Sequence, residues 1–286
     1  MIEKPPFVFF GTDQFAVAVL DRLKKAGLKP GLIVTTPDSP QGRGQKTKPS
    51  TVASWAKENN RKFIRPAKLD EKEIRHHYPI LLDVSAEIFI VASYGKIIPE
   101  YLIEHPPKKT LNIHPSLLPR LRGPAPIAGA ILAAEETGIT IMVLDKLMDH
   151  GPIIGQQTID ISGQSAGQAG LTLAQAGADL LVDLLPAWLA GKLKAEDQDH
   201  HLATFSKKIT KTDGLIDPTG EAGGNYRRYL ALSPTPGTYF FQQTNGQNTR
   251  IKITAAHLAD NRFIIDRVIP AGKAEMSWID FSRNIK

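Results

Sequence analysis

The first hundred residues switch between two hydrophobic periods. Short, almost continuous apolar runs occupy residues 7–11, 32–35 and 87–92, which is typical of strands buried on both faces. Between the first two runs, residues 15–23 carry apolar side chains at helical spacing, and Asp13 stands where it can cap that helix. Strands that alternate with helices predict an α/β fold with a Rossmann-like, doubly wound, mostly parallel sheet and right-handed crossovers.

The middle of the chain continues this pattern. It predicts a short helix, two strands and one long helix, in that order over residues 126–134, 138–144, 155–161 and 169–189. Residues 192–205 are rich in charge and histidine, which is typical of a linker.

After the linker the pattern changes to short alternating strands at residues 239–241, 250–253 and 263–268. A meander of this length is compatible with a small C-terminal β-barrel of the OB type. We therefore expect an α/β domain, a linker and an OB-like domain, over residues 1–190, 191–206 and 207–286.

The amino-acid composition indicates which class of protein the chain belongs to. The chain has 286 residues, 42% of them hydrophobic and 22% charged, as in soluble globular proteins. Residues 1–6 contain no apolar targeting region, and no later apolar run approaches the roughly 18 residues that span a bilayer, so we expect a cytoplasmic protein without a membrane partner. There is no cysteine, which excludes disulfides and thiolate ligands, and the adjacent histidines at 76–77 and 200–201 point in different directions, so we expect no metal site.

The positive charge is concentrated at the C-terminal end. The net charge is +6, and residues 207–286 contain 12 Lys+Arg against 7 Asp+Glu, a difference of +5. A basic surplus of this kind favours polyanionic partners through counterion release. A solvated basic face explains the charge equally well when the charge is considered alone.

Three polar side chains form a candidate reaction centre. Residues 108–114 alternate apolar with polar positions, and Pro115 ends the predicted strand because it lacks a backbone donor. Asn112 and His114 are two positions apart and share one strand face, near the carboxyl end where ligands bind in open α/β sheets. Asp149 follows His114 by 35 residues (149 − 114). Together they offer an amide, an imidazole and a carboxylate to a single carbonyl group.

The first strand does not carry a dinucleotide fingerprint. Only Gly11 stands where a G-x-G-x-x-G motif would need three glycines. We therefore reject a nicotinamide-dependent dehydrogenase.

The segment Asn-Ile-His-Pro-Ser-Leu-Leu-Pro at 112–119, with Asp149-His150-Gly151, resembles the folate-dependent formyltransferases. Segments 37–46 and 122–127 are similar to those of the family members that formylate methionyl-tRNA. The resemblance implies transfer of a formyl group from 10-formyltetrahydrofolate to the α-amino group of aminoacylated initiator tRNA, in translation initiation. No metal is implied.

The resemblance also implies roles for the three polar side chains. Asn112 and His114 donate hydrogen bonds to the oxyanion of the tetrahedral intermediate, and Asp149 orients or charges the imidazole and relays a proton from the amine. A carboxylate beside an imidazole favours the imidazolium form. Asp145 is then ordinary loop structure, and His150 is expected to be a surface residue.

Two sets of binding residues follow from the same resemblance. The residues implied in folate binding are Ser116, Leu117, Leu118, Pro119, Ser93, Tyr94 and Gly95. The loop over 37–49 has no apolar residue to anchor it, and it is expected to be flexible and to contact the tRNA acceptor stem. Its cationic residues are Arg43, Lys46 and Lys48, of which Arg43 is the expected RNA contact.

The chain departs from the family at its C-terminal end, which is short. Residues 214–229 lack the apolar helix pattern expected there. This departure concerns how the tRNA body is bound and leaves the N-terminal catalytic assignment intact. Three alternatives remain: formylation of a nucleotide sugar or another small amine, hydrolysis of the formyl-folate, and a non-catalytic RNA-binding protein on the same scaffold. A monomer is expected.

Overall fold

The computed structural model describes residues 6–41, 46–244 and 246–283. The chain forms two compact units. The first unit contains the described residues of 1–122, 137–160 and 170–205, and the second contains those of 123–136, 161–169 and 206–286. Two short segments from the middle of the chain therefore group with the C-terminal residues.

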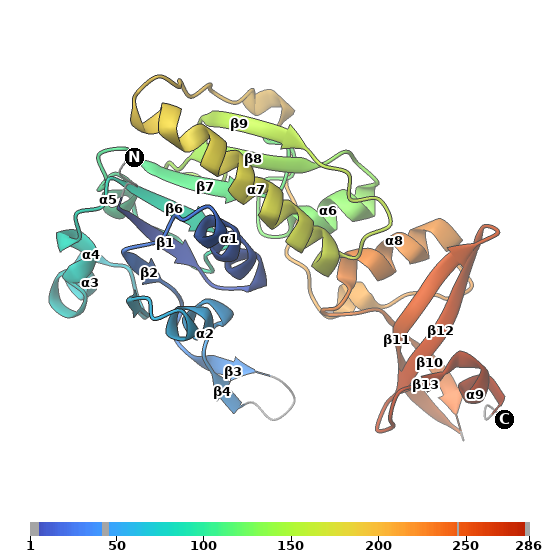
Figure 1. The fold of residues 1–286 in the computed structure, drawn as a ribbon. Coiled ribbons are helices and arrows are strands. Elements are labelled where there is room, and N and C mark those ends of the chain that lie inside the picture. The colour runs from blue at the N-terminus through green and yellow to red at the C-terminus, as the bar shows by residue number, and fades with distance from the viewer. Residues whose placement is uncertain (1–5, 42–45, 245, 284–286) are drawn as a thin grey trace. The chain divides into compact units, whose positions relative to one another are not determined.

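The first unit is built on a sheet whose described strands follow the order β5-β2-β1-β6-β7-β8-β9 (Figure 1). The five strands from β5 to β7 run parallel, and β8 and β9 are antiparallel at one edge. Their bounds are β1 Phe7–Gly11, β2 Leu32–Val34, β5 Phe63–Ile64, β6 Ile88–Ala92, β7 Thr110–His114, β8 Gly138–Val143 and β9 Ile153–Thr158. The prediction of a Rossmann-like, mostly parallel sheet is confirmed.

Helices cover both faces of this sheet. They are α1 Gln14–Lys25, α2 Thr51–Glu58, α3 Glu71–His77, α4 Ile80–Asp83, α5 Glu100–Ile103 and α7 Ala166–Leu189. On one face, Phe10 and Phe89 pack with Ile74 of α3, Leu81 of α4 and Leu102 of α5. Figure 1 shows α1 and α7 lying together over the other face. The continuous apolar strands are explained by this burial on both sides.

A close approach of α7 to the sheet fixes which face of β7 is left for polar residues. A Cβ added to Gly177 of α7 would lie 2.5 Å from Ile113 Cγ2 and 2.7 Å from Ile139 Cγ1, so the helix backbone almost touches β7 and β8 at this point. Ile113 therefore faces α7. Asn112 and His114, on either side of it in the strand, face the opposite way.

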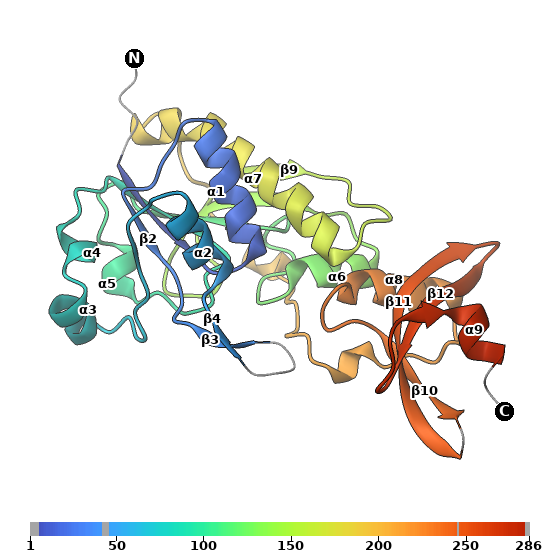
Figure 2. The same cartoon turned by 60° about the horizontal axis from the view of Figure 1, so that its bottom comes forward.

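The loop expected over 37–49 contains a hairpin of two short strands, β3 Ser39–Gln41 and β4 Lys46–Lys48. The strands pair antiparallel, with Ser39 opposite Lys48 and Gln41 opposite Lys46. The hydrophobic pattern gave no strand signal here because a polar two-stranded ribbon is held by backbone hydrogen bonds and buries no apolar face. Figure 2 shows the hairpin extending from the region of α2.

The second unit contains a four-stranded antiparallel sheet among its described residues, in the order β10-β11-β12-β13. Its elements are α6 Pro126–Ala133, α8 Ala222–Leu232, β10 Tyr239–Thr244, β11 Gln247–Ala259, β12 Arg262–Pro270, β13 Met276–Ser277 and α9 Trp278–Arg283. Phe240, Ile251 and Val268 form its core with Phe281 of α9, and α9 lies against β12 (Figure 2). The prediction of antiparallel strands at the C-terminal end is confirmed, and helices α8 and α9 accompany them.

Helix α8 begins in a region where the sequence lacks a helical pattern. The Glu221 carboxylate caps it by accepting hydrogen bonds from the backbone N–H groups of Gly223 and Gly224. Only its last turn is buried, through Leu230 and Leu232. The cap and one buried turn therefore replace the missing apolar stripe.

No helix among the described residues has the length and apolar character that a bilayer span requires.

Candidate active site

The carboxyl ends of β1 and β6 are tied together at the point where the strand order reverses. Thr12 N donates to Ser93 O at 3.0 Å, and Gly95 N donates to Thr12 Oγ1 at 3.2 Å. Ser93 Oγ donates to Asp13 Oδ2 at 2.6 Å. Ligands of open α/β sheets bind beside such a switch point, and β7 is the next strand along.

Asn112 and His114 lie on β7 and are almost buried, at 8% and 5% exposure. Val91 of β6 is in register with Asn112, so the loop that follows β6 leaves the sheet beside His114. Thr140 of β8 is the partner of His114 on the other side. The amide and the imidazole therefore lie on an interior strand of the sheet, which is paired on both sides, near its carboxyl end.

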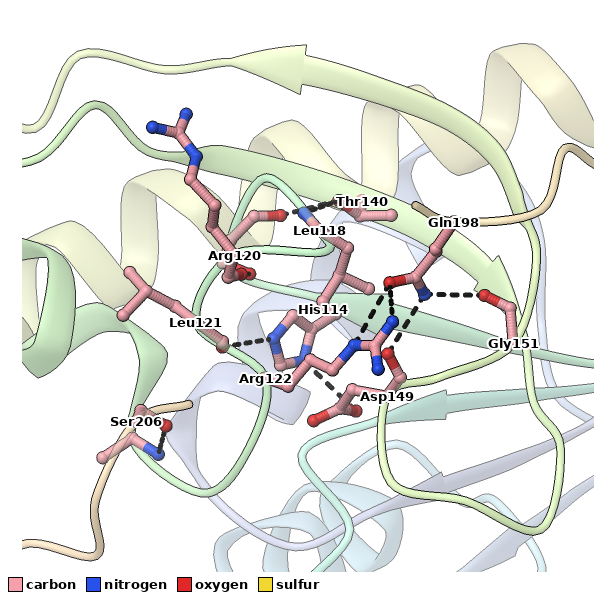
Figure 3. A network of polar contacts seen from close by, with 12 residues as sticks. His114, Leu118, Arg120, Leu121, Arg122, Thr140, Asp149, Gly151, Gln198 and Ser206 are labelled. Atoms are coloured by element: carbon pink, nitrogen blue, oxygen red, sulfur yellow. Dashed lines mark hydrogen bonds and ion pairs between the residues drawn. The ribbon is translucent and has the colours of Figure 1, made fainter. Parts of the chain in front are cut away.

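The structure brings Asp149 to His114, as expected from the sequence. His114 Nδ1 lies 3.5 Å from Asp149 Oδ1, and both side chains are mostly buried (Figure 3). His114 Nε2 lies 3.1 Å from the carbonyl oxygen of Leu121. Because a carbonyl oxygen only accepts, Nε2 carries a proton in this arrangement. Nδ1 is then the imidazole position at which a proton can be gained or lost.

The loop that carries Asp149 has a demanding backbone. Asp149 adopts a left-handed conformation with φ of +51°. A Cβ at residue 151 would lie 2.0 Å from the carbonyl oxygen of Val143, so only glycine fits there. The spacing Asp-x-Gly in the sequence therefore has a physical origin: the glycine lets the loop close onto β8.

Asp145 and His150 hold the same loop. Asp145 Oδ1 accepts from Leu147 N at 2.9 Å, and Asp145 Oδ2 lies 2.7 Å from His150 Nδ1. The His150 ring stacks on His200, with centroids 4.0 Å apart and an angle of 11° between the planes. Asp145 is loop structure as expected, but His150 is only partly exposed, because its ring is covered by His200.

Two buried residues near Asp149 were missed by the sequence analysis. Arg122 and Gln198 are 4% and 6% exposed and lie together behind the Asp149 loop (Figure 3). Gln198 lies in the segment predicted to be a linker, where a single glutamine among charged residues gives no signal. Arg122 belongs to a segment noted only for its family resemblance.

The expected folate residues after β7 divide into structural and accessible groups. Ser116 is fully buried, and its hydroxyl donates to Arg120 O at 2.7 Å. Leu118 is also buried. Leu117 and Pro119 are partly exposed and line a cavity of about 470 Å³. Of this set, Leu117 and Pro119 thus present the most accessible side chains.

The residues after β6 also differ in accessibility. Tyr94 packs edge-on against Phe10, with centroids 5.5 Å apart, and burial raises the pKa of its hydroxyl. Ser93 and Gly95 are exposed. Ile97, which the sequence analysis did not single out, is 91% exposed. An apolar side chain so exposed beside a candidate site is a natural contact for a flat ring.

Lys96 anchors the loop after β6 through its side chain. Its Nζ donates to the carbonyl oxygens of Pro66, at 2.8 Å, and Ala67, at 2.5 Å. Partial burial lowers the pKa of Lys96. The two bonds tie the loop after β6 to the residues that follow β5.

The expected tRNA contacts that the structure describes are solvent-exposed, unlike the buried Asn112 and His114. Lys46 and Lys48 are exposed on β4, and Arg43 lies outside the described residues.

Among the described part of the chain, no group of three or more His, Asp or Glu side chains is arranged to hold a metal ion. The candidate site itself offers the amide of Asn112, the imidazole of His114 and the carboxylate of Asp149 to a reacting carbonyl.

Comparison with known proteins identifies the family. The family model described as "Formyl transferase" matches residues 6–185. The methionyl-tRNA formyltransferase of Chloroflexus aurantiacus is 40% identical over 264 residues, which cover 92% of this chain and 84% of that protein. The chain belongs to the methionyl-tRNA formyltransferase family. The resemblance inferred from the motifs is thus confirmed, and the protein is a formyl-transferring enzyme.

Solved structures of formyltransferases share the fold. A methionyl-tRNA formyltransferase from Clostridium thermocellum has a TM-score of 0.62 at 15% identity, covering 93% of this chain and 98% of that one. A sugar N-formyltransferase from Shewanella sp FDAARGOS_354 has a TM-score of 0.63 at 17% identity, covering 89% of this chain and 99% of that one. At such identities the likeness concerns the fold alone, and the acceptor must be argued from the family relatives and the site.

Proposed function

We propose that this enzyme transfers the formyl group of 10-formyltetrahydrofolate to the α-amino group of methionyl-initiator-tRNA, in the cytoplasm, for translation initiation. The observation that carries the proposal is the buried approach of Asp149 to His114, two residues from Asn112 on the same strand face. The 40% identity to a named methionyl-tRNA formyltransferase over most of both chains supports the acceptor.

The reaction makes two demands on the protein. The amine nitrogen forms a bond to the formyl carbon, the bond from that carbon to N10 of the folate breaks, and the proton lost by the amine ends on N10. The folate supplies the activated formyl group. The protein must stabilise the negative oxygen of the tetrahedral intermediate and carry the proton, which requires hydrogen-bond donors beside a group that accepts and releases protons.

Asn112 meets the first demand. Its side-chain amide forms no hydrogen bond with another described residue, so its two N–H donors are free for a ligand. Its burial keeps competing water away, which makes a donor worth more than in solution. We assign Asn112 as one donor to the oxyanion.

His114 and Asp149 meet the second demand together. Since Nε2 of His114 is held by the Leu121 carbonyl, a second proton on the ring resides on Nδ1, the nitrogen that faces Asp149. The separation of 3.5 Å exceeds the usual hydrogen-bond range, so a ligand beside the pair can still bond to each group. We assign protonated His114 as the second oxyanion donor and Asp149 as the acceptor of the amine proton, which it relays toward N10.

The loop after β6 and the turn after β7 fit a folate. A pterin is a flat ring with a polar edge, and Ile97 offers an uncovered apolar surface beside the backbone groups of Ser93 and Gly95. Leu117 and Pro119 supply apolar surface at the cavity that they line after β7. We assign ring contact to Ile97, edge recognition to the backbone of 93–95, and contact with the rest of the folate to Leu117 and Pro119.

The acceptor tRNA is assigned to the basic surfaces. The hairpin with Lys46 and Lys48, together with Arg43, is proposed to contact the acceptor stem, and residues 207–286, with their charge difference of +5, to form an OB-like tRNA-binding domain. The proposed catalytic residues all come from one chain, so we propose that a monomer is active.

The test is formyl acceptance. Purified enzyme with 10-formyltetrahydrofolate is given either methionyl-initiator-tRNA or a nucleotide-linked amino sugar, and formylated product and free formate are both measured. We expect formyl-methionyl-tRNA and no formyl sugar. Formylation of the sugar with untouched tRNA would assign the alternative acceptor, formate without any acceptor would indicate a hydrolase, and tRNA binding with no chemistry would indicate a non-catalytic RNA-binding protein.

A further inference from the structure

Gln198 connects the Asp149 loop to a buried arginine. Its Nε2 lies 3.0 Å from the carbonyl oxygen of Asp149 and 2.7 Å from that of Gly151. Its Oε1 lies 3.2 Å from Nε and 2.6 Å from Nη2 of Arg122. Figure 3 shows the amide between the guanidinium on one side and the loop carbonyls on the other.

The chemistry of these partners fixes the orientation of the amide. A guanidinium only donates and a backbone carbonyl only accepts, so Oε1 must face Arg122 and Nε2 must face the loop. Both donors and both acceptor positions of Gln198 are then occupied. A buried amide with every hydrogen bond satisfied has one orientation, and it holds its partners firmly.

Arg122 is itself held from its far side. Its Nη2 lies 2.9 Å from His200 Nδ1, which must therefore be the unprotonated ring nitrogen. The His200 ring stacks on His150, and His150 is bound to Asp145 at the start of the same loop. The loop from Asp145 to Gly151 is thus held at both ends by one connected set of contacts, made of hydrogen bonds and the stacked pair of histidine rings.

The backbone conformation of Asp149 requires stabilisation by surrounding contacts. A left-handed backbone is unfavourable for a residue with a Cβ and persists only where surrounding contacts enforce it. The bonds from Gln198 to the carbonyls of Asp149 and Gly151 act on the peptide units that join Asp149 to His150 and Gly151 to Pro152. They determine the direction in which the Asp149 Cα–Cβ bond leaves the loop, and hence where its carboxylate lies relative to His114.

We propose that Gln198 is a positioning residue for formyl transfer, which sets the Asp149 carboxylate against His114 Nδ1 through the loop backbone, with Arg122 fixing the orientation of the Gln198 amide. This inference rests on the proposed role of Asp149. It assigns a catalytic consequence to a side chain that itself touches neither substrate.

The first experiment replaces Gln198 in the full-length enzyme. Gln198→Glu keeps the shape and the acceptors for Arg122 and replaces the two donors to the loop by a carboxylate oxygen, and Gln198→Met removes all four bonds at similar length. We expect kcat to fall at least tenfold in both variants, with KM for folate and for tRNA changed less than threefold. Asn59→Leu is the matched control, because Asn59 also accepts from a cation, Lys24, and donates to a backbone carbonyl, that of Trp55.

The second experiment separates positioning from a general structural role. In an Asp149→Ala background, a residue that acts through Asp149 has nothing left to position, so Gln198→Glu should lower kcat by less than twofold. The same fold-loss in both backgrounds, or a kcat within twofold of wild type for both single variants while they remain folded, would overturn the proposal. Full activity of Asp149→Ala alone would instead overturn the role assigned to Asp149, so the two failures are distinguishable.

Discussion

The carboxyl end of β7 and the β3–β4 hairpin belong to the same unit but hold their polar groups in opposite ways. Asn112 and His114 are at least nine-tenths buried and are set by strand register. The Asp149 carboxylate, which lies beside His114, is positioned by a loop with no room for a side chain at Gly151. Lys48 on the hairpin is exposed on a two-stranded ribbon. One region holds its polar groups buried and closely packed, and the other presents an exposed charge to solvent.

The difference matches what each region is proposed to do. Stabilising an oxyanion depends steeply on donor geometry, because a displacement of about 1 Å can lower a rate on the order of 10²-fold. Attraction of a phosphate backbone by exposed lysines depends on charge and is screened by salt. Substitutions in the first region should therefore act on kcat, and those in the second on tRNA affinity.

The largest effect is expected at His114. His114→Ala removes an oxyanion donor and should lower kcat on the order of 10²–10³-fold, while the Kd for tRNA stays within twofold. Single-turnover formylation and filter binding measure the two quantities. His76→Ala, an exposed histidine on α3, is the control and should behave as wild type. Normal turnover in His114→Ala would remove the basis of the comparison.

The glycine of the Asp149 loop should give the next largest effect. Gly151→Ala places a Cβ against the Val143 carbonyl oxygen, 2.0 Å away before any relaxation, and should destabilise the protein by about 1–3 kcal/mol and lower kcat on the order of 10²-fold. Gly163→Ala is the converse case, because Gly163 has a positive φ of +70° but nothing within 4 Å of the added Cβ. It should lose only stability, about 1–2 kcal/mol. Thermal unfolding and kcat are measured for both, and equal kcat values would contradict the account.

A smaller effect is expected where the folate is proposed to lie. Ile97→Ser removes an exposed apolar side chain that a bound pterin would cover, and about 1.4 kcal/mol of lost apolar contact corresponds to a tenfold rise in KM for 10-formyltetrahydrofolate. Ile80→Ser, at a partly exposed isoleucine of α4, is the matched control and should leave KM unchanged. Steady-state titration of the folate decides, and an unaltered KM in Ile97→Ser would place the pterin elsewhere.

The smallest single effects are expected on the hairpin. Lys46→Ala and Lys48→Ala should each raise KM for tRNA a few-fold at low salt and reduce the slope of log K against log salt by about 1, with kcat unchanged. Lys29→Ala, at an exposed lysine before β2 and so beyond the amino ends of the parallel strands, serves as control. Binding titrations at several salt concentrations measure the slope. A loss of kcat rather than affinity would contradict the division between the two regions.

Local signals made the sheet and the catalytic motif predictable. Continuous apolar runs identify strands buried on both faces, as in β1 and β6. Asn112 and His114 follow from the two-residue period of a strand that ends at a proline. Asp149 required the family pattern, because nothing in the spacing of 35 residues shows that the two segments meet. Gly151 was part of that pattern, but its reason appears only with the Val143 carbonyl beside it.

The remaining parts depend on tertiary contacts that leave no periodic trace. Gln198 is one amide in a charged segment, and its importance comes from where Arg122 and two loop carbonyls lie. Helix α8 depends on a single capping carboxylate, Glu221, and the β3–β4 hairpin on backbone pairing among polar residues. Hydrophobic patterns report burial of apolar faces, so features held by hydrogen bonds alone are the ones they miss.

The central claim is that one formyl group is surrounded by Asn112, His114 and Asp149. A crystal structure of the enzyme with a stable formyl-folate analogue tests it most directly. The account predicts the formyl oxygen within about 3 Å of the Asn112 amide nitrogen and of His114 Nδ1, with the Asp149 carboxylate beside the face from which an amine approaches. A bound analogue whose formyl group lies away from all three side chains would contradict it.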